Sequence, residues 1–396
     1  MMSANSRQFT LLPPLSLYIH IPWCIKKCPY CDFNSHAAGD HIPEDEYVDA
    51  LIRDINSELP NVWGRRISSI FIGGGTPSLF SAASYERLLS HIHAVLPCLP
   101  DMEITLEANP GTFEQNKFSD FRKTGINRLS IGIQSFDDQQ LATLGRVHNG
   151  LEARRAIDMV HKAGFDNFNL DLMYALPSQT TQQAIRDLKT ALSFKPTHLS
   201  HYQLTIEPNT FFHTHVPEKL PENDLIWEMQ HESQRLLAST GFQQYEVSAY
   251  SQAGCQSQHN LNYWQFGDYL GIGAGAHGKI SRADNNQVYR VSKLRQPKAY
   301  MQHAGQKTVI STQDDITAAQ IDFEFMLNAL RLKQGVETEL YQQRTGQHLD
   351  SIDEKIQLAV AKGLLDTSQQ RIKPTEQGFL FLNDLLLIFL QEDERS

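Results

Sequence analysis

The chain has 396 residues, of which 41% are hydrophobic and 20% are charged, and its formal net charge is −10. This length supports more than one domain and a large buried core. The acidic balance argues against nucleic acid as a partner, because phosphate binding requires a basic surface.

The chain shows no targeting or membrane-spanning signal. Its first twelve residues lack a charged segment followed by a long apolar run, so no signal peptide is indicated. The longest apolar stretch, residues 378–390, is too short to span a bilayer, although it leaves a peripheral membrane contact open. The five cysteines are sparse and odd in number, which favours a reducing compartment. We therefore expect a cytoplasmic protein.

The first half of the chain alternates between short apolar runs and segments with helical spacing of apolar residues. Six strands that alternate with helices indicate parallel β–α–β units. Right-handed crossovers would curl these units into an α/β fold, an open (β/α)6 partial TIM barrel. We expect strands at residues 15–20, 67–72, 104–108, 128–133, 168–173 and 198–204, and helices at residues 44–59, 79–96, 151–163 and 180–194.

The pattern changes after the predicted barrel. We expect a helix at 224–241, a strand at 242–247, and an irregular, locally basic segment at 279–298. From about residue 300 the chain is mainly helical, and we expect a barrel with its extension over residues 1–300 and a winged-helix-like domain over 301–396. The expected elements of that domain are helices at 316–332, 338–344, 351–362 and 378–390, with a hairpin at 364–372. Because its third helix has few cations, we expect a lid or docking surface and no DNA-reading helix.

Three of the five cysteines, Cys24, Cys28 and Cys31, fall within eight residues with the spacing C-x3-C-x2-C. So close a set cannot form disulfides throughout and suits a soft metal. A structural zinc site normally has four ligands in two pairs, which are not present here. Three cysteines on a [4Fe–4S] cluster leave one iron open to a reactant. A zinc loop or a set of buried thiols is the structural alternative.

A glycine run and several polar residues follow the predicted strands. Gly73-Gly74-Gly75-Thr76-Pro77 comes directly after the second strand, and consecutive glycines expose backbone groups to a ligand. Polar residues stand at or just after the third to fifth strands, on the rim where α/β barrels build their sites. Each alone could be a helix cap or a surface ion pair. These polar residues are Glu107, Gln134, Arg146 and Asp171.

Together these motifs resemble the radical S-adenosylmethionine (SAM) superfamily, and more narrowly the oxygen-independent coproporphyrinogen III oxidases and their relatives. The resemblance covers residues 15–390 and includes Tyr-x-His-x-Pro-x-Cys-x3-Cys-x2-Cys, Gly-Gly-Gly-Thr-Pro, Glu-x-x-Pro, Gly-x-Gln-Ser-Phe and Asp-Leu-Met-Tyr-x-Leu-Pro. It implies the open barrel, a [4Fe–4S] cluster on the three cysteines, and SAM on the open iron. The residues it places around SAM are Tyr18, Gly74, Gly75, Thr76, Glu107, Gln134, Arg146 and Asp171, with Thr205 and His277 as further candidates.

The sequence departs from the oxidases at one informative position. The oxidases continue the motif to a fourth cysteine, where this chain has Phe33, and the long N-terminal extension expected of the oxidases is missing. Both features resemble the HemW group of heme chaperones, as does His259-Asn-Leu-Asn-Tyr263-Trp264. An imidazole beside aromatic rings could bind heme iron. A structural histidine packed under Tyr263 and Trp264 is the alternative for His259.

The resemblance implies a heme chaperone that binds a [4Fe–4S] cluster, SAM and heme and passes heme to apo-proteins, among them membrane-associated respiratory proteins. On this interpretation the cluster and SAM control either heme transfer or oligomerisation. A homodimer is the oligomer that we consider. Whether the chain is an enzyme stays open. The alternative of a different class is oxidative decarboxylation of coproporphyrinogen III, and a third is radical chemistry on an unrelated substrate.

Overall fold

The computed structural model describes residues 7–9, 11–39, 41–111 and 117–390, so the outermost ends of the two predicted domains, residues 1–6 and 391–396, lie outside the described residues. Six parallel strands stand side by side in chain order in a large curved sheet. The open (β/α)6 barrel is thus confirmed. Its strands are β1 (Leu15–Ile21), β4 (Ile67–Gly74), β5 (Cys98–Ala108), β6 (Arg128–Gln134), β7 (Phe168–Tyr174) and β8 (His198–Gln203).

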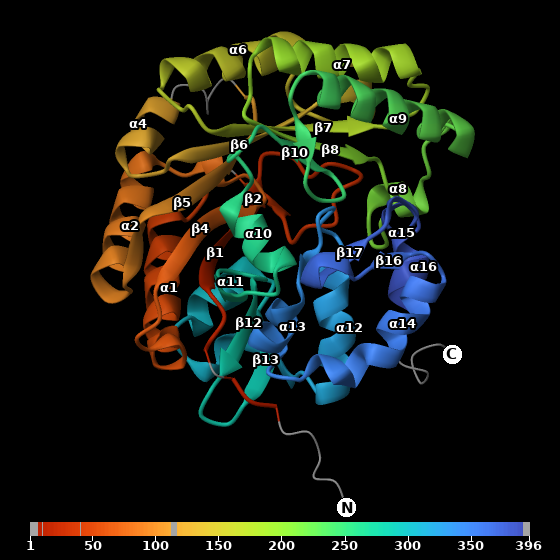
Figure 1. The fold of residues 1–396 in the computed structure, drawn as a ribbon. Coiled ribbons are helices and arrows are strands. Elements are labelled where there is room, and N and C mark those ends of the chain that lie inside the picture. Colours follow the sequence, from red (N-terminus) through yellow and green to blue (C-terminus); the bar gives the residue numbers. More distant parts are fainter. Residues whose placement is uncertain (1–6, 10, 40, 112–116, 391–396) are drawn as a thin grey trace, which may run out of the picture.

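Helices cover the outside of this barrel (Figure 1). The helices that the sequence predicts between the strands are present as α1 (Glu44–Glu58), α2 (Ala82–Val95), α6 (Gly150–Lys162) and α7 (Thr181–Ser193). A capping box opens α6 and another opens α7, so each helix begins where its strand–helix loop ends. The remaining elements of the barrel and its loops are β2 (Trp23–Cys24), β3 (His36–Ala37), α4 (Phe118–Lys123), α5 (Asp138–Thr143), α8 (Phe211–Thr214) and α9 (Asn223–Ser239).

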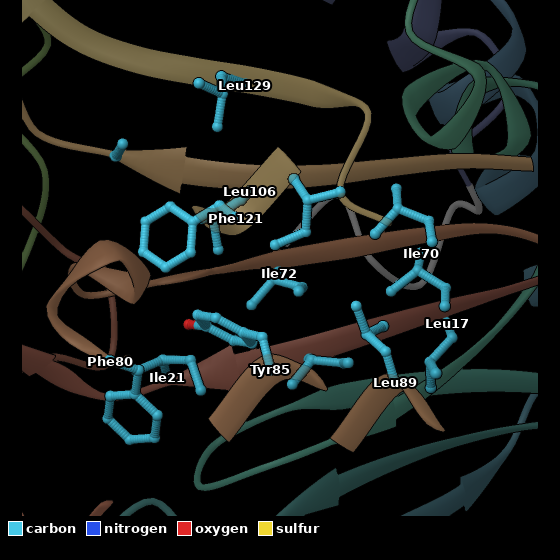
Figure 2. Close-up of a cluster of buried hydrophobic side chains, with 14 of the residues drawn as sticks. Leu17, Ile21, Ile70, Ile72, Phe80, Tyr85, Leu89, Leu106, Phe121 and Leu129 are labelled. Carbon is cyan, nitrogen blue, oxygen red and sulfur yellow. The ribbon is translucent and has the colours of Figure 1, made fainter. Parts of the chain in front are cut away.

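The main core lies between the parallel strands and the covering helices. Figure 2 shows Ile70 and Ile72 of β4 close to Tyr85 and Leu89 of α2, with Leu17 of β1 beside them. All seven residues of β6 are buried, which is typical of a parallel strand covered on both faces. Its apolar residues Leu129, Ile131 and Ile133 alternate with Ser130 and Gly132, a period of two that is typical of a strand.

The sheet continues beyond the six predicted strands. On one side β11 (Asp268–Ile272) pairs parallel to β1, and β12 (His277–Arg282), β13 (Gln287–Lys293) and β14 (Ile310–Asp315) follow antiparallel. The predicted irregular segment at 279–298 was therefore wrong. Its basic residues Lys279 and Lys293 are both buried, and acidic residues of other elements neutralise them.

The other edge of the sheet also differs from the expectation. The strand predicted at 242–247 is reduced to the two-residue β9 (Gln243–Gln244), which pairs with β10 (Ala249–Ser251). β10 in turn runs antiparallel to β8. Two helices complete the extension of the barrel, α10 (Gln258–Trp264) and α11 (Pro297–His303).

The C-terminal module (residues 316–390) has the element order of a winged helix, as predicted. α12 (Ala318–Ala329), β15 (Val336–Glu337), α13 (Thr338–Thr345) and α14 (Asp353–Ala361) precede the hairpin of β16 (Leu365–Asp366) and β17 (Arg371–Pro374). The module shares a second core with residues of α10 and β13, and β14 still belongs to the large sheet. A domain boundary between residues 300 and 301 stays a prediction.

The apolar stretch predicted as one helix at 378–390 is two short helices. They are α15 (Glu376–Leu380) and α16 (Leu382–Leu387), and the chain breaks at Phe381, whose ψ of 48° is not helical. Among the residues that the structure describes, no helix is long and apolar enough to cross a membrane.

A buried ion cluster joins the extension to the barrel. The Lys293 ammonium of β13 lies 2.8 Å from Asp54 Oδ1 and 2.5 Å from Glu58 Oε1, both on α1. Tyr300 of α11 donates a hydrogen bond of 2.8 Å to the other oxygen of Asp54. Burial raises the pKa of Asp54, whereas Lys293 opposes that rise. The Lys293 ammonium thus stabilises the charged form of the buried Asp54.

Replacing this cation should leave two carboxyl groups buried without their partner. Lys293→Met is expected to cost about 3–5 kcal/mol of unfolding free energy at neutral pH. The loss should shrink as the pH falls, because the buried carboxyls then take up protons more readily in the folded than in the unfolded chain. Urea unfolding from pH 5 to pH 8 measures this. Lys123→Met, which removes an exposed ion pair with Asp120, is the matched control and should change little.

Candidate cofactor site

A cavity of about 320 Å³, the cofactor cavity, opens at the carboxyl ends of the parallel strands. Sites in α/β barrels are built at this end. The structure brings ten of the sequence-predicted site residues together around it. They are Cys24, Cys28, Cys31, Gly74, Gly75, Thr76, Glu107, Gln134, Arg146 and Asp171.

The glycine run at the end of β4 is hydrogen-bonded to the backbone at the start of the cysteine loop. Gly75 N–H donates to Ile21 O and Thr76 N–H donates to Trp23 O, each at 2.7 Å. A Cβ atom on Gly75 would lie only 2.5 Å from Trp23 O, and one on Gly74 would lie 2.7 Å from the ring of His20. The glycines are therefore required by the close approach of the loop itself, a reason that differs from the ligand contact expected from the sequence.

The three cysteines suit a cluster better than a single ion. In the part of the chain that the structure describes, no three His, Cys, Asp or Glu side chains converge tightly enough to hold one metal ion. Cys24, Cys28 and Cys31 nevertheless line one cavity and are partly exposed in it. Each cysteine of a [4Fe–4S] cluster binds a different iron, so its thiolates stand farther apart than the ligands of a zinc ion. The donor set thus fits an iron–sulfur cluster with one open iron.

Two carboxyl groups line the cavity, one from β5 and one from β7. Glu107 Oε2 accepts a hydrogen bond of 3.1 Å from Gly74 N–H. Asp171 accepts hydrogen bonds from Ser130 Oγ and from Asn169 Nδ2. Burial, with a smaller contribution from Asp171, raises the pKa of Glu107 to about 8, and burial also raises the pKa of Asp171. Such a pair suits a ligand with an ammonium group and hydroxyl donors.

A cation also lines the cavity, next to Cys28. Arg146 Nη2 donates to Asn109 Oδ1 at 2.6 Å and to Gly132 O at 2.8 Å, and its Nη1 lies 3.6 Å from Cys28 Sγ. Arg146 Nε is buried and has no hydrogen-bond partner among the described residues. This donor could bind a carboxylate, so the cavity offers the cation that the carboxylate of SAM requires.

The cavity also contains residues that sequence reasoning missed. One of them is Tyr202, whose hydroxyl donates a hydrogen bond of 2.7 Å to the predicted Gln134. Gln134 itself has a left-handed φ of 66°. Ser200 and Tyr202 alternate along β8, so their period of two could have placed them on the inner face. Asn109 lies within the Glu-x-x-Pro motif, so the sequence could have identified it as a site residue. Tyr30, inside the cysteine motif, gave no signal of its own.

Four predicted site residues lie elsewhere. Tyr18 and His277 line a second cavity of about 560 Å³, the aromatic cavity, and do not line the first. Thr205 is exposed and donates a hydrogen bond to Glu207. His259 is fully buried on α10, and neither cavity is lined by it.

The position of His259 favours the structural alternative. Its Nδ1 lies 3.0 Å from Ser69 Oγ and its Nε2 lies 3.1 Å from Tyr263 OH, so both ring nitrogens are occupied. Burial, and secondarily Arg128, lowers the pKa of His259 to about 3. An axial heme ligand needs one nitrogen free to meet the iron, and the His259 imidazole offers none in this arrangement.

Comparisons with known proteins agree with this geometry. Residues 18–191 match the family described as the Radical SAM superfamily, and residues 316–381 match the HemN C-terminal domain. The heme chaperone HemW of Escherichia coli is 47% identical over 381 residues, which cover 96% of this chain and 99% of that protein. The heme chaperone HemW of Bacillus subtilis is 35% identical over 384 residues, covering 95% of this chain and 99% of that one. The solved structure of E. coli coproporphyrinogen III oxidase (HemN) matches with a TM-score of 0.80 at 24% identity, covering 96% of this chain and 90% of that one.

The cysteine assignment predicts the metal content of single variants. Anaerobic reconstitution of the wild type should give about four irons per chain, and Cys28→Ala should abolish the cluster because one iron loses its ligand. Cys98→Ala and Cys255→Ala are matched controls, since neither thiol lines the cavity. Iron and sulfide analysis with EPR measures this. A full cluster in Cys28→Ala would contradict the assignment.

The raised pKa of Glu107 predicts proton release on SAM binding. At pH 7 the carboxyl holds a proton, and an ammonium group beside it should favour the carboxylate and displace that proton. Calorimetry in two buffers of different ionisation enthalpy should detect the release, which should fade as the pH rises above about 8. Glu107→Gln should bind SAM more weakly and release no proton. Binding heats that do not depend on the buffer in the wild type would rule this out.

Proposed function

Because the chain belongs to the HemW family of heme chaperones within the radical SAM superfamily, we propose that it binds heme and transfers it to heme-accepting apo-proteins. The observation that carries the proposal is similarity along the whole chain, at 47% identity, to a relative named for this activity. Phe33 supports it, because the oxidases that the motifs resemble have a fourth cysteine there. The Phe33 ring is 59% exposed and lines both cavities.

The cofactors of this family belong in the cofactor cavity. Cys24, Cys28 and Cys31 would hold the [4Fe–4S] cluster, and Glu107 and Arg146 would face the ammonium and carboxylate groups of SAM. The remaining polar residues of the cavity, Thr76, Gln134 and Asp171, would orient the rest of SAM by hydrogen bonds. When bound, the cluster supplies one electron to a reducible sulfonium. We propose that cluster and SAM control heme transfer or the assembly of a homodimer.

The heme acceptors are proposed to be respiratory apo-proteins, including membrane-associated ones, reached from the cytoplasm. Nucleic acid is not proposed as a partner. The third helix of the C-terminal module, α14, begins Asp353-Glu354 and has a single lysine within its bounds. A helix that reads DNA needs more cations than this.

Coproporphyrinogen oxidation is the competing function, and the structural match to E. coli coproporphyrinogen III oxidase (HemN) is the observation that favours it. At 24% identity that match describes the fold. Radical SAM barrels are similar across many chemistries, so a shared fold does not transfer a substrate. The missing fourth cysteine and the full-length relatives both favour the chaperone.

An anaerobic assay pair separates the two functions. The reconstituted protein should bind heme, seen as a Soret band, and should show no decarboxylation of coproporphyrinogen with SAM and a reductant present. Phe33→Cys should not create oxidase activity, because substrate positioning requires a whole pocket. E. coli HemN is the positive control for the turnover assay. Conversion of coproporphyrinogen by the unmodified protein would overturn the chaperone proposal.

A further inference from the structure

The aromatic cavity lies beside the cofactor cavity, with the Phe33 ring lining both. Its volume of about 560 Å³ is within the range of sites for organic ligands. The lining residues come from β1, the cysteine loop, α10 and the β11–β13 extension, together with Leu327 and Asn328 of α12 in the C-terminal module. Aromatic rings dominate this lining, which suits a flat, conjugated ligand. They belong to Tyr18, Phe33, Tyr263, Trp264, Phe266 and Tyr269.

The charge of this cavity is opposite to that of the protein. Lys279, Arg290 and Arg295 line it, and Asp32 is the only acidic residue among its described lining residues, although the chain as a whole carries −10. Lys279 and Arg290 are already paired, with Asp268 and Glu324 respectively. The exposed Arg295 guanidinium makes no hydrogen bond or ion pair with any described residue. It is therefore available to a carboxylate of a ligand.

A second donor at the cavity also lacks a partner. The indole N–H of Trp264 is buried and has no hydrogen-bond partner among the described residues. Arg331 covers the face of the same indole ring, with its guanidinium carbon 4.3 Å from the ring centroid. A buried donor without an acceptor is unusual in a folded protein, and a polar ligand group would satisfy it.

Two histidines line the cavity, and only one of them has a free imidazole. His20 is occupied at both nitrogens, by Tyr18 OH at 3.0 Å and by Asn34 O at 2.8 Å. His277, the first residue of β12, is exposed, and no described residue makes a hydrogen bond with its ring. Burial, with Arg290 and Arg295 adding to it, lowers the pKa of His277. The lowered pKa favours the neutral imidazole, the form that binds metals.

We propose that the aromatic cavity is the binding site of an iron porphyrin dicarboxylate, with His277 as the axial iron ligand and Arg295 as the partner of one propionate. This inference rests on the proposed heme chaperone function and deepens it. It moves the iron ligand from the buried His259 to the histidine that faces the cavity. His259 keeps a positioning role, because its Nε2 bonds the hydroxyl of Tyr263, which lines the same cavity.

Heme and metal-free protoporphyrin, titrated side by side, test the two parts of the site. His277→Ala should shift the Soret band and weaken heme binding at least about tenfold, since the iron loses a ligand. It should leave protoporphyrin affinity unchanged, and added imidazole should restore the Soret position. Arg295→Gln should weaken both ligands about twofold to fivefold, as expected of an exposed ion pair. His41→Ala, which replaces an exposed histidine that lines neither cavity, is the matched control.

The outcomes separate this inference from the function on which it rests. A wild-type protein that binds no heme would remove the proposed function. Heme binding that is intact in His277→Ala but lost in His259→Ala would keep that function and overturn the His277 assignment. Equal loss of heme and protoporphyrin in His277→Ala would mean that the residue shapes the cavity without binding iron, which also contradicts the inference.

Discussion

The close approach of the cysteine loop to the glycine run at the end of β4 is the constraint on which the site depends. Trp23 O accepts from Thr76 N–H, and only a glycine at position 75 leaves room for that contact. At its other end the loop is held again, because Pro29 O accepts from Phe212 N–H at 2.9 Å and the Pro29 ring packs where Gly145 has no side chain. Two glycines far apart in the sequence thus clamp one loop, which presents its three cysteines to the cavity.

The cysteine loop also contributes lining residues to both cavities. Its cysteines face the cofactor cavity, whose Glu107, Asp171 and Arg146 offer separate positions for the charged ends of an amino acid. Its next residues, from Asp32 to Asn34, line the aromatic cavity. The Phe33 ring lies at the boundary, where a cysteine would have extended the cluster motif. On the proposed assignment of the two cavities, Phe33 would lie between the redox cofactor and the flat ligand.

Much of this arrangement was predictable from the sequence. The six parallel strands contain short runs rich in apolar residues, and the predicted residues lie at or near their ends, so ten of them do meet in one cavity. The sequence indicated an irregular, locally basic segment at 279–298, but the lysines there are buried in the sheet. Lys279 pairs with Asp268 of the neighbouring strand, and Lys293 pairs with Asp54, which lies 239 residues away. The aromatic neighbours of His259 suggested that its imidazole could bind heme iron. Its burial and its contact with Ser69, which lies 190 residues away, favour a structural role instead. Such facts depend on tertiary contacts that no local pattern records.

A heme chaperone must bind heme and transfer it to another protein. The direct measurement is heme transfer from the loaded, cluster-bearing protein to a heme-free respiratory acceptor, followed by the spectrum of the acceptor after separation. Excess apomyoglobin, which traps free heme, gives the rate of passive release for comparison. Transfer to the acceptor should be faster than this passive release and should be retained when a trap for free heme is present. Transfer no faster than passive release, and abolished by the trap, would contradict the chaperone function.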